Sequence, residues 1–278
     1  MNTFHLPETV KLKKEIGFMD ISHPLRKAPL RIFIMLAVAV ITLVTTGYSQ
    51  SGTAFRISNN PKVTNLTSNG TPTQHTFGRN TSGDVIHYYW SPIPSWAAEN
   101  LTTGYSNIGT AYRVATDLAV ITGPTADSNA LVLHAFGRNS AGDLIHYYWI
   151  SSLGWAAENL TTGYSNIGTA FRIVNTPVVI NLFSNNTPTQ HVFGRNSIGD
   201  VIHYYWSPSA GWAAENLTAG YSNIGIAYRV VSDLAVINGP TSDSNAPVQH
   251  VFARNSAGDL IHYYWISSQG WAAENLTN

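Results

Sequence analysis

The sequence predicts an all-β protein that is assembled from four copies of one repeat. The clearest part of the repeat begins with a histidine, and at 191–206 it reads His-Val-Phe-Gly-Arg-Asn-Ser-Ile-Gly-Asp-Val-Ile-His-Tyr-Tyr-Trp. That first histidine recurs with spacings of 59, 57 and 59 residues, as His75, His134, His191 and His250. A fixed period of this length indicates repeated supersecondary units. No segment after residue 49 keeps the 3.6-residue periodicity of an amphipathic helix, so we expect almost no helix there.

The first fifty residues differ from the rest and are predicted to be a leader. Residues 1–31 are polar and basic, and residues 32–44 form a run that is apolar except for Thr42 and is followed by the small residue Gly47. As a helix this run would reach ~20 Å, less than the ~30 Å hydrocarbon core of a bilayer. The order is typical of a secretory signal with cleavage near Ser49 or Gln50. The alternative is an uncleaved membrane anchor with its basic side inside. Either leaves the repeats secreted or on the extracellular surface.

Each repeat is expected to form four strands, because short runs rich in Val, Ile, Phe, Tyr and Trp alternate with Gly, Asn, Ser and Pro. In the second repeat these runs are Leu118–Ile121, His134–Arg138, Asp143–Trp149 and Trp155–Leu160. A short hairpin with a glycine in the left-handed conformation is predicted between the second and third strands. The glycines at this place are Gly83, Gly142, Gly199 and Gly258.

Four antiparallel strands repeated around an axis describe the blades of a β-propeller, which usually has four to eight of them. A linear solenoid is the rival, but its repeats are commonly shorter and its ends need capping repeats. We therefore expect residues 51–278 to form a closed four-bladed ring. The alternative is two copies that associate into eight blades. The expected blades are approximately 52–104, 105–163, 164–220 and 221–278.

The repeats also alternate in pairs. The first and third share Thr-Pro-Thr-Gln-His, at 71–75 and 187–191, whereas the second and fourth carry Asp-Leu-Ala-Val-Ile, at 117–121 and 233–237. The even repeats are longer by two residues between their first and second strands. We infer a two-blade unit of 116 residues that was later doubled. Any site borne by loops should then exist in two versions, each present twice.

Composition excludes several classes of function. The formal net charge is zero and charged residues are 11% of the chain, which argues against nucleic acid as a partner. There is no cysteine, so disulfides and thiolate metal sites are absent. The two histidines of each repeat lie across a hairpin without a fixed third ligand, so no metal or other cofactor is expected. Every acid recurs equally in all repeats and no catalytic motif occurs, so we expect no enzyme.

Four recurring side chains in each repeat are the candidates for ligand binding. An arginine ends the second strand, a tryptophan ends the third, and a Trp-Ala-Ala-Glu segment follows. The tryptophans have a structural explanation as core between blades. Alternatively, some of them stack on a sugar ring while Arg and Glu bind its hydroxyl groups. The candidates are Arg79, Trp90, Trp96, Glu99, Arg138, Trp149, Trp155, Glu158, Arg195, Trp206, Trp212, Glu215, Arg254, Trp265, Trp271 and Glu274.

The acids of the repeat are assigned differently. Asp84, Asp143, Asp200 and Asp259 follow the hairpin glycines, so each is expected to pair weakly across the hairpin with the arginine of its own second strand. A second set of arginines, Arg56, Arg113, Arg172 and Arg229, precedes the first strands. The glutamates have no evident local partner, which makes them candidates for a ligand.

The run at 192–206 resembles the blade motif of bacterial propeller lectins related to the Photorhabdus fucose-binding lectins and the tectonins. The resemblance covers residues 52–278 and not the leader. It implies a β-propeller with sugar-binding pockets between blades. The chain departs from those lectins in its smaller number of blades and in the Tyr-Tyr before the tryptophan.

These observations lead to one main functional hypothesis and one alternative. The first is a secreted or surface-displayed, noncatalytic propeller that binds glycans, fucosylated or of another cell-surface kind, at several weak sites. The membrane would be a partner only through an uncleaved N-terminal segment. The alternative is a structural or protein-interaction scaffold without a sugar ligand.

Overall fold

The computed structural model describes residues 52–68, 70–92, 95–125, 128–150, 154–184, 187–241, 244–266 and 268–278. The predicted leader and its cleavage position lie outside these residues. The regular elements within them are strands and four 3-10 turns. Across these ranges, no helix has the length and apolar character needed to span a membrane. The turns are η1 (Thr53–Phe55), η2 (Thr110–Tyr112), η3 (Thr169–Phe171) and η4 (Ile226–Tyr228).

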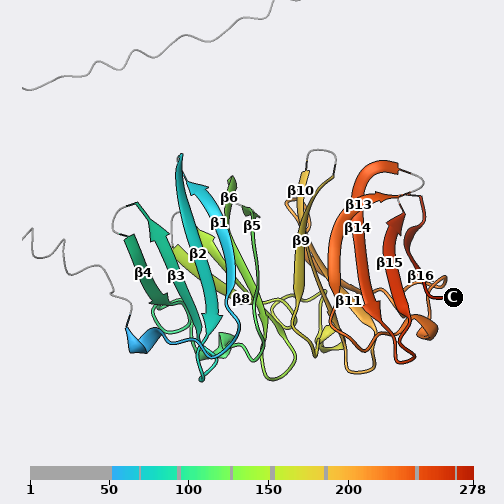
Figure 1. Ribbon diagram of the computed structural model, residues 1–278, viewed down its shortest axis with the longest axis horizontal. Coiled ribbons are helices and arrows are strands. Elements are labelled where there is room, and N and C mark those ends of the chain that lie inside the picture. Colours follow the sequence, from blue (N-terminus) through green and yellow to red (C-terminus); the bar gives the residue numbers. More distant parts are fainter. Residues whose placement is uncertain are drawn as a thin grey trace, which may run out of the picture. The chain divides into compact units, whose positions relative to one another are not determined.

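Sixteen strands form four antiparallel sheets of four, each made of consecutive strands, so the predicted all-β repeat is confirmed (Figure 1). Blade 1 consists of β1 (Lys62–Ser68), β2 (Thr71–Arg79), β3 (Val85–Ser91) and β4 (Ser95–Asn100). Blade 2 consists of β5 (Ala119–Thr125), β6 (Ser128–Arg138), β7 (Leu144–Ile150) and β8 (Gly154–Asn159). Blade 3 consists of β9 (Val178–Ser184), β10 (Thr187–Arg195), β11 (Val201–Ser207) and β12 (Gly211–Asn216). Blade 4 consists of β13 (Ala235–Thr241), β14 (Ser244–Arg254), β15 (Leu260–Ile266) and β16 (Gly270–Asn275).

The hairpin between the second and third strands of each blade is as predicted. Gly83 has a φ of 86°, and a side chain there would bring its Cβ to 2.7 Å from the carbonyl oxygen of Val114. Asn80 closes the same turn, because its Oδ1 accepts hydrogen bonds from the backbone amides of Ser82 and Asp84, both at 2.9 Å. A left-handed conformation and a close approach of backbone therefore both require glycine here.

The hydrophobic core lies between consecutive blades. Val85 and Phe77 of blade 1 are fully buried in one cluster with Tyr147 and Trp155 of blade 2. The innermost strands neighbour one another in chain order, β1 with β5, β5 with β9 and β9 with β13. Burial on both faces explains why the third strands are apolar or aromatic at nearly every position.

The closed ring that we expected is not seen. Trp155 is fully buried by blade 1, but its counterpart Trp96 in blade 1 is 49% exposed. At the other end, Leu276 of blade 4 is 49% exposed, whereas Leu101 in blade 1 is fully buried. Blades 1 and 4 thus each keep one uncovered face.

Candidate ligand-binding grooves between blades

A buried aspartate fixes one arginine at each junction between blades. The Oδ1 of Asp84 lies 2.7 Å from the Nε of Arg113, and its Oδ2 accepts hydrogen bonds from the side chains of Asn80 and Asn100, both at 3.1 Å. Burial alone would raise the pKa of Asp84, but these hydrogen bonds outweigh it and hold the pKa below its ordinary value. Asp84 is therefore ionised at neutral pH. Equivalent pairs join Asp143 to Arg172 at 2.7 Å and Asp200 to Arg229 at 2.8 Å.

This pairing corrects the expected one, in which Asp84 would pair with Arg79 across its own hairpin. Residues 113–118, the linker between η2 and β5, fold back onto the hairpin that joins β2 and β3. There the amide of Val114 donates to the carbonyl of Gly83 at 2.8 Å. This contact brings Arg113 rather than Arg79 to the carboxylate. Arg79 is left with one long bond, from its Nη1 to the carbonyl of Asn80 at 3.5 Å. Its Nε is buried and has no hydrogen-bond partner among the described residues, and the same is true of Arg138 and Arg195.

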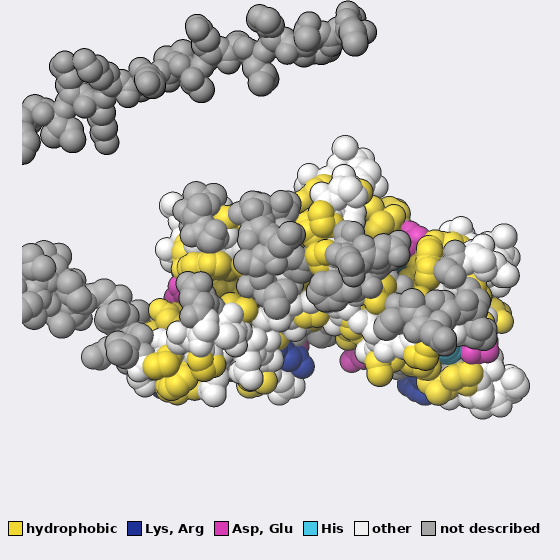
Figure 2. Space-filling model, turned by 90° about the horizontal axis from the view of Figure 1, so that it is seen from above, with side chains coloured by type: hydrophobic (Ala, Val, Ile, Leu, Met, Phe, Trp, Pro, Cys, Tyr) yellow, Lys and Arg dark blue, Asp and Glu magenta, His cyan; other side chains and the backbone are white. Residues whose placement is uncertain are grey.

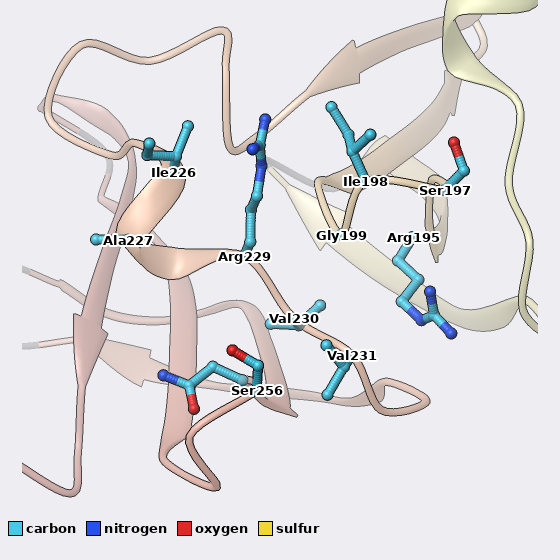
Figure 3. Close-up of a pocket in the computed structure, with 11 residues that line it drawn as sticks. Arg195, Ser197, Ile198, Gly199, Ile226, Ala227, Arg229, Val230, Val231 and Ser256 are labelled. Carbon is cyan, nitrogen blue, oxygen red and sulfur yellow. The ribbon is translucent and has the colours of Figure 1, made fainter.

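The two sets of arginines meet in grooves between blades. The groove between blades 3 and 4 has a volume of about 340 Å³ and contains Arg195 at the end of β10 and Arg229 from the linker. Figure 3 shows Arg229 between Ile226 and Ile198, with Arg195 on the other side of the hairpin. Ser197 and Ser256 contribute hydroxyl groups to the lining.

An equivalent groove lies between blades 1 and 2. It has a volume of about 440 Å³ and contains Arg79 and Arg113, together with Ser140 of the next hairpin. Arg79 and Arg195 are 116 residues apart, as are Arg113 and Arg229. These two grooves are therefore related by the two-blade period that we inferred from the alternation of the repeats.

The chemistry of the grooves favours a ligand that carries several hydrogen-bond acceptors, such as hydroxyl oxygens. The Nη groups of Arg229 donate to no protein acceptor among the described residues. They remain as free hydrogen-bond donors of fixed position, since the Nε is held by Asp200. In the groove between blades 3 and 4, Ile198 and Ile226 are 59% and 72% exposed and offer apolar contact beside these donors. The groove between blades 1 and 2 has Ser82 and Thr110 at the same places. The described linings of both grooves contain no Asp, Glu or His. They therefore provide no pair of groups for acid–base catalysis.

The candidate glutamates lie elsewhere and have structural partners, contrary to our expectation. The carboxylate of Glu99 accepts hydrogen bonds from His87 Nδ1 at 2.8 Å, the Tyr105 hydroxyl at 2.6 Å and Trp155 Nε1 at 2.9 Å. Trp155 belongs to the next blade, so this group of four residues, the glutamate clamp, joins two blades. Burial alone would raise the pKa of Glu99, but the bonds from His87, Tyr105 and Trp155 lower it. Glu158 and Glu215 form equivalent clamps.

The candidate tryptophans that end the third strands lie at the opposite end of the blade from the arginines. In the strand pairing, Arg79 lies opposite Val85 at one end of β3, whereas Trp90 lies opposite Gln74 and Trp96 at the other end. Five residues at ~3.3 Å each place the two ends ~17 Å apart. Trp155, Trp212 and Trp271 are buried at blade junctions, whereas Trp149 is 37% exposed. The structure therefore does not bring Arg, Glu and Trp together in one pocket, as the sequence suggested.

The same separation holds for the remaining candidates. Arg138 and Arg254 end β6 and β14, and neither lines one of the two grooves. Trp206 is nearly buried and Trp265 is half-buried. Glu274 receives a hydrogen bond from His262 and is 48% exposed, since no further blade covers it.

The two histidines of each blade bond to one another rather than standing apart. His75 Nδ1 lies 2.9 Å from His87 Nε2, and His87 in turn contacts Glu99. Burial, together with the neighbouring His87, lowers the pKa of His75 from 6.5 to about 4. Burial also lowers the pKa of His87, against the opposing effect of Glu99. These imidazoles are part of a buried hydrogen-bond chain that runs across the sheet to the glutamate clamp.

Sequence reasoning missed Arg113 and Arg229 as groove residues, although it singled out their set. Asp and Arg recur together in every repeat, but 29 residues separate Asp84 from Arg113. The recurrence of both residues, with the two asparagines that bind the same carboxylate, was the available signal.

Comparison with known proteins supports the propeller-blade fold. Residues 133–161 and 248–275 match a repeat of unknown function (DUF346). A search of curated proteins found no match. Among solved structures, AofleA from Arthrobotrys oligospora is 12% identical with a TM-score of 0.52, covering 80% of this chain and 58% of that one. The lectin of Aleuria aurantia, described as a six-bladed β-propeller with a novel mode of fucose recognition, is 13% identical with a TM-score of 0.51.

The alignment with the Aleuria lectin covers 80% of this chain and 65% of that one, so this chain spans less than two thirds of either relative. A further similar structure is a variant of AofleA in which three arginines are replaced by alanine, with 13% identity, a TM-score of 0.50 and the same coverage as AofleA. The sheets of this chain thus have the fold of β-propeller blades.

Proposed function

We propose that the chain is a noncatalytic carbohydrate-binding propeller and that the grooves containing Arg79 and Arg195 hold the sugar. The observation that carries the proposal is the pair of arginines that recurs in both grooves, one of them fixed by a buried aspartate. The similarity in fold to the Aleuria lectin makes L-fucose the first ligand to test.

The groove residues divide the work of binding. Guanidinium groups donate hydrogen bonds to hydroxyl oxygens, and Arg229 does so with little loss of entropy because Asp200 already fixes it. Ile198 and Ile226 contact the apolar face or the methyl group of the sugar. Each groove alone binds weakly, and two grooves on one chain raise the apparent affinity for a surface with many glycans.

The proposal also places the protein outside the cytoplasm, secreted or on the cell surface. The support for this location is the sequence of the basic residues 1–31 and the apolar run 32–44, which is typical of a signal or an anchor. Glycans displayed at high density, to which a protein with repeated sites binds with higher avidity, occur at cell surfaces.

Calorimetry of the full chain with methyl α-L-fucoside, after a glycan array to rank other sugars, tests the proposal. We expect Arg195→Ala to reduce the number of binding sites and Arg79→Ala combined with Arg195→Ala to weaken affinity at least tenfold. Lys62→Ala, which removes a half-buried cation from β1 outside both grooves, is the control. Sugar binding that survives the double substitution would place the site elsewhere. An array without any bound glycan would favour the alternative, a scaffold without a sugar ligand.

A further inference from the structure

Three contacts recur at every junction between consecutive blades. The tryptophan of the later blade donates to the glutamate of the earlier one, as Trp155 does to Glu99 at 2.9 Å. A tyrosine hydroxyl of the later blade contacts a threonine of the earlier one, as Tyr147 does with Thr102 at 2.7 Å. The arginine of the linker pairs with the aspartate of the earlier blade. Each junction therefore joins two different and complementary faces.

Blade 4 presents the earlier-blade half of this junction without a partner blade. The Glu274 side chain is 48% exposed, against 23–24% for Glu99, Glu158 and Glu215. Leu260 is 43% exposed, whereas Leu144 at the same place in blade 2 is fully buried. Asp259 binds the side chains of two asparagines, as its counterparts do, but no arginine among the described residues.

Blade 1 presents the later-blade half. Trp96 is 49% exposed, whereas its three counterparts at the internal junctions, Trp155, Trp212 and Trp271, are at most 3% exposed. Arg56 is exposed and has no acidic partner among the described residues, unlike Arg113. Tyr88 donates to the carbonyl of Phe55 at 2.7 Å, which is the bond that Tyr147 makes to Tyr112. Tyr88 is thus already positioned as Tyr147 is at the internal junction.

We propose that the face of blade 4 binds the face of blade 1 of a second copy, head to tail, through the same contacts that join blades within the chain. Trp96 of one copy donates to Glu274 of the other, Arg56 pairs with Asp259, and Tyr88 contacts Thr277. The charges are complementary, and the exposed Trp96, Leu260 and Leu276 are removed from water.

A contact between two different faces is heterologous, so it closes only if the rotation between copies allows. Two copies that make it twice form a ring of eight blades, which lies within the range that propellers use. A second copy fits better than an unrelated partner, because three copies of the same interface already exist inside the chain.

The test is a pair of charge reversals in the full chain, measured by light scattering after size-exclusion chromatography. One chain has a mass of 30.3 kDa, so the dimer has about twice that mass. Arg56→Asp and Asp259→Arg each bring like charges together in both contacts of the ring, and each variant should lose at least tenfold in association. When the two variants are mixed in equal amounts, a dimer of one copy of each has opposite charges at both contacts. One contact is the native pair of Arg56 and Asp259, and the other has the two charges exchanged. Dimers should therefore form again. Asp233→Arg, at an exposed acid in the linker before β13, is the control and should leave the dimer intact.

Recovery on mixing also proves that each single variant is folded. A wild-type chain that is monomeric at all concentrations would overturn the proposal. So would an assembly that persists in both single variants, because it would then be held by another part of the chain, such as the apolar run 32–44.

Discussion

The glutamate clamp and the arginine groove lie at the same junctions between blades, but they differ in how completely the protein satisfies them. Both carboxylate oxygens of Glu99 have partners, and Trp155 is fully buried against the clamp. In the groove, Arg79 has a buried Nε without a partner, and the Nη groups of Arg113 have no acceptor among the described residues. The polar atoms of the clamp are all hydrogen-bonded within the chain, so the clamp holds blades together. The arginines of the groove keep N–H groups without an acceptor in the described part of the chain, which suits the groove to a ligand.

Recurrence in every repeat therefore does not separate structure from function here. Glu, Trp and Arg recur equally in the sequence, yet of these candidates only arginines line the two described grooves. The distinction comes from whether each polar atom already has a partner. Four measurements can sharpen or break it.

Acid should have the largest effect, because it acts on the histidine chains of several blades together. Burial lowers the pKa of His75, His87, His191, His203 and His262 below 6.5. At a pH between the ordinary histidine pKa of 6.5 and the lower pKa in the folded state, the unfolded chain binds more protons than the folded chain. These histidines therefore stabilise the fold fully above pH 6.5, and this contribution is lost as the pH falls toward 4, the pKa of folded His75. We expect Tm to drop steeply in that window, as measured by calorimetry. A Tm that stays constant from pH 7 to 4.5 would contradict the lowered pKa values.

Trp155→Ala should be the most damaging single substitution at a junction. It removes a fully buried indole that contacts Phe77 and His87 of blade 1, so we expect a loss of ~3–5 kcal/mol in the free energy of unfolding. Trp96→Ala is the matched control, because no blade covers Trp96 within the chain. It should cost far less when measured by urea unfolding in the Arg56→Asp background, which is expected to be monomeric. Equal losses would mean that Trp96 is buried after all.

Glu99→Gln tests the clamp itself with little change in shape. It removes the charge from three hydrogen bonds, and we expect a loss of ~1–3 kcal/mol in the free energy of unfolding. Glu274→Gln at the exposed end of blade 4, in the same monomeric background, should cost less than 1 kcal/mol, because surface ion pairs contribute ~0–1 kcal/mol. If the glutamates instead held sugar, Glu99→Gln would abolish binding and leave the stability unchanged.

Arg195→Ala should have the smallest effect on folding. Arg195 is half-buried at the end of β10, and its side chain makes no ion pair among the described residues, so its loss should change the free energy of unfolding by about 0.5 kcal/mol. Removing the unpartnered Nε should even offset part of the loss. The same variant should lose sugar binding in its groove. A large loss of stability would assign Arg195 to the structure rather than to the ligand.

The strands and hairpins could be predicted because their determinants are local. A glycine at Gly83 and an asparagine at Asn80 specify the turn within five residues, and the period fixes how often it occurs. The junctions could not be predicted, because Trp155 and Glu99 are 56 residues apart and meet only when blades pack. Ring closure could not be predicted from the sequence for a related reason, since it depends on the small rotation at each junction and on no single residue.

One feature of the leader also bears on the predicted cleavage. Residues 45–49 read Thr-Thr-Gly-Tyr-Ser, the same five residues as 102–106. Cleavage near Ser49 or Gln50 would therefore remove Tyr48, the counterpart of the clamp residue Tyr105. Mass spectrometry of the mature N-terminus would show whether the repeat is kept whole.

The uncovered face of blade 4 has a consequence for how the protein opens. In a linear array of repeats, each unit is stabilised by its neighbours, so units at the ends open more often than those between them. Backbone amides of β16, next to the exposed Leu276, should exchange with deuterium fastest, and those of β7 and β11, buried between blades, should exchange slowest. Dimerisation would flatten this gradient, so the exchange rate in β16 would fall as the protein concentration rises.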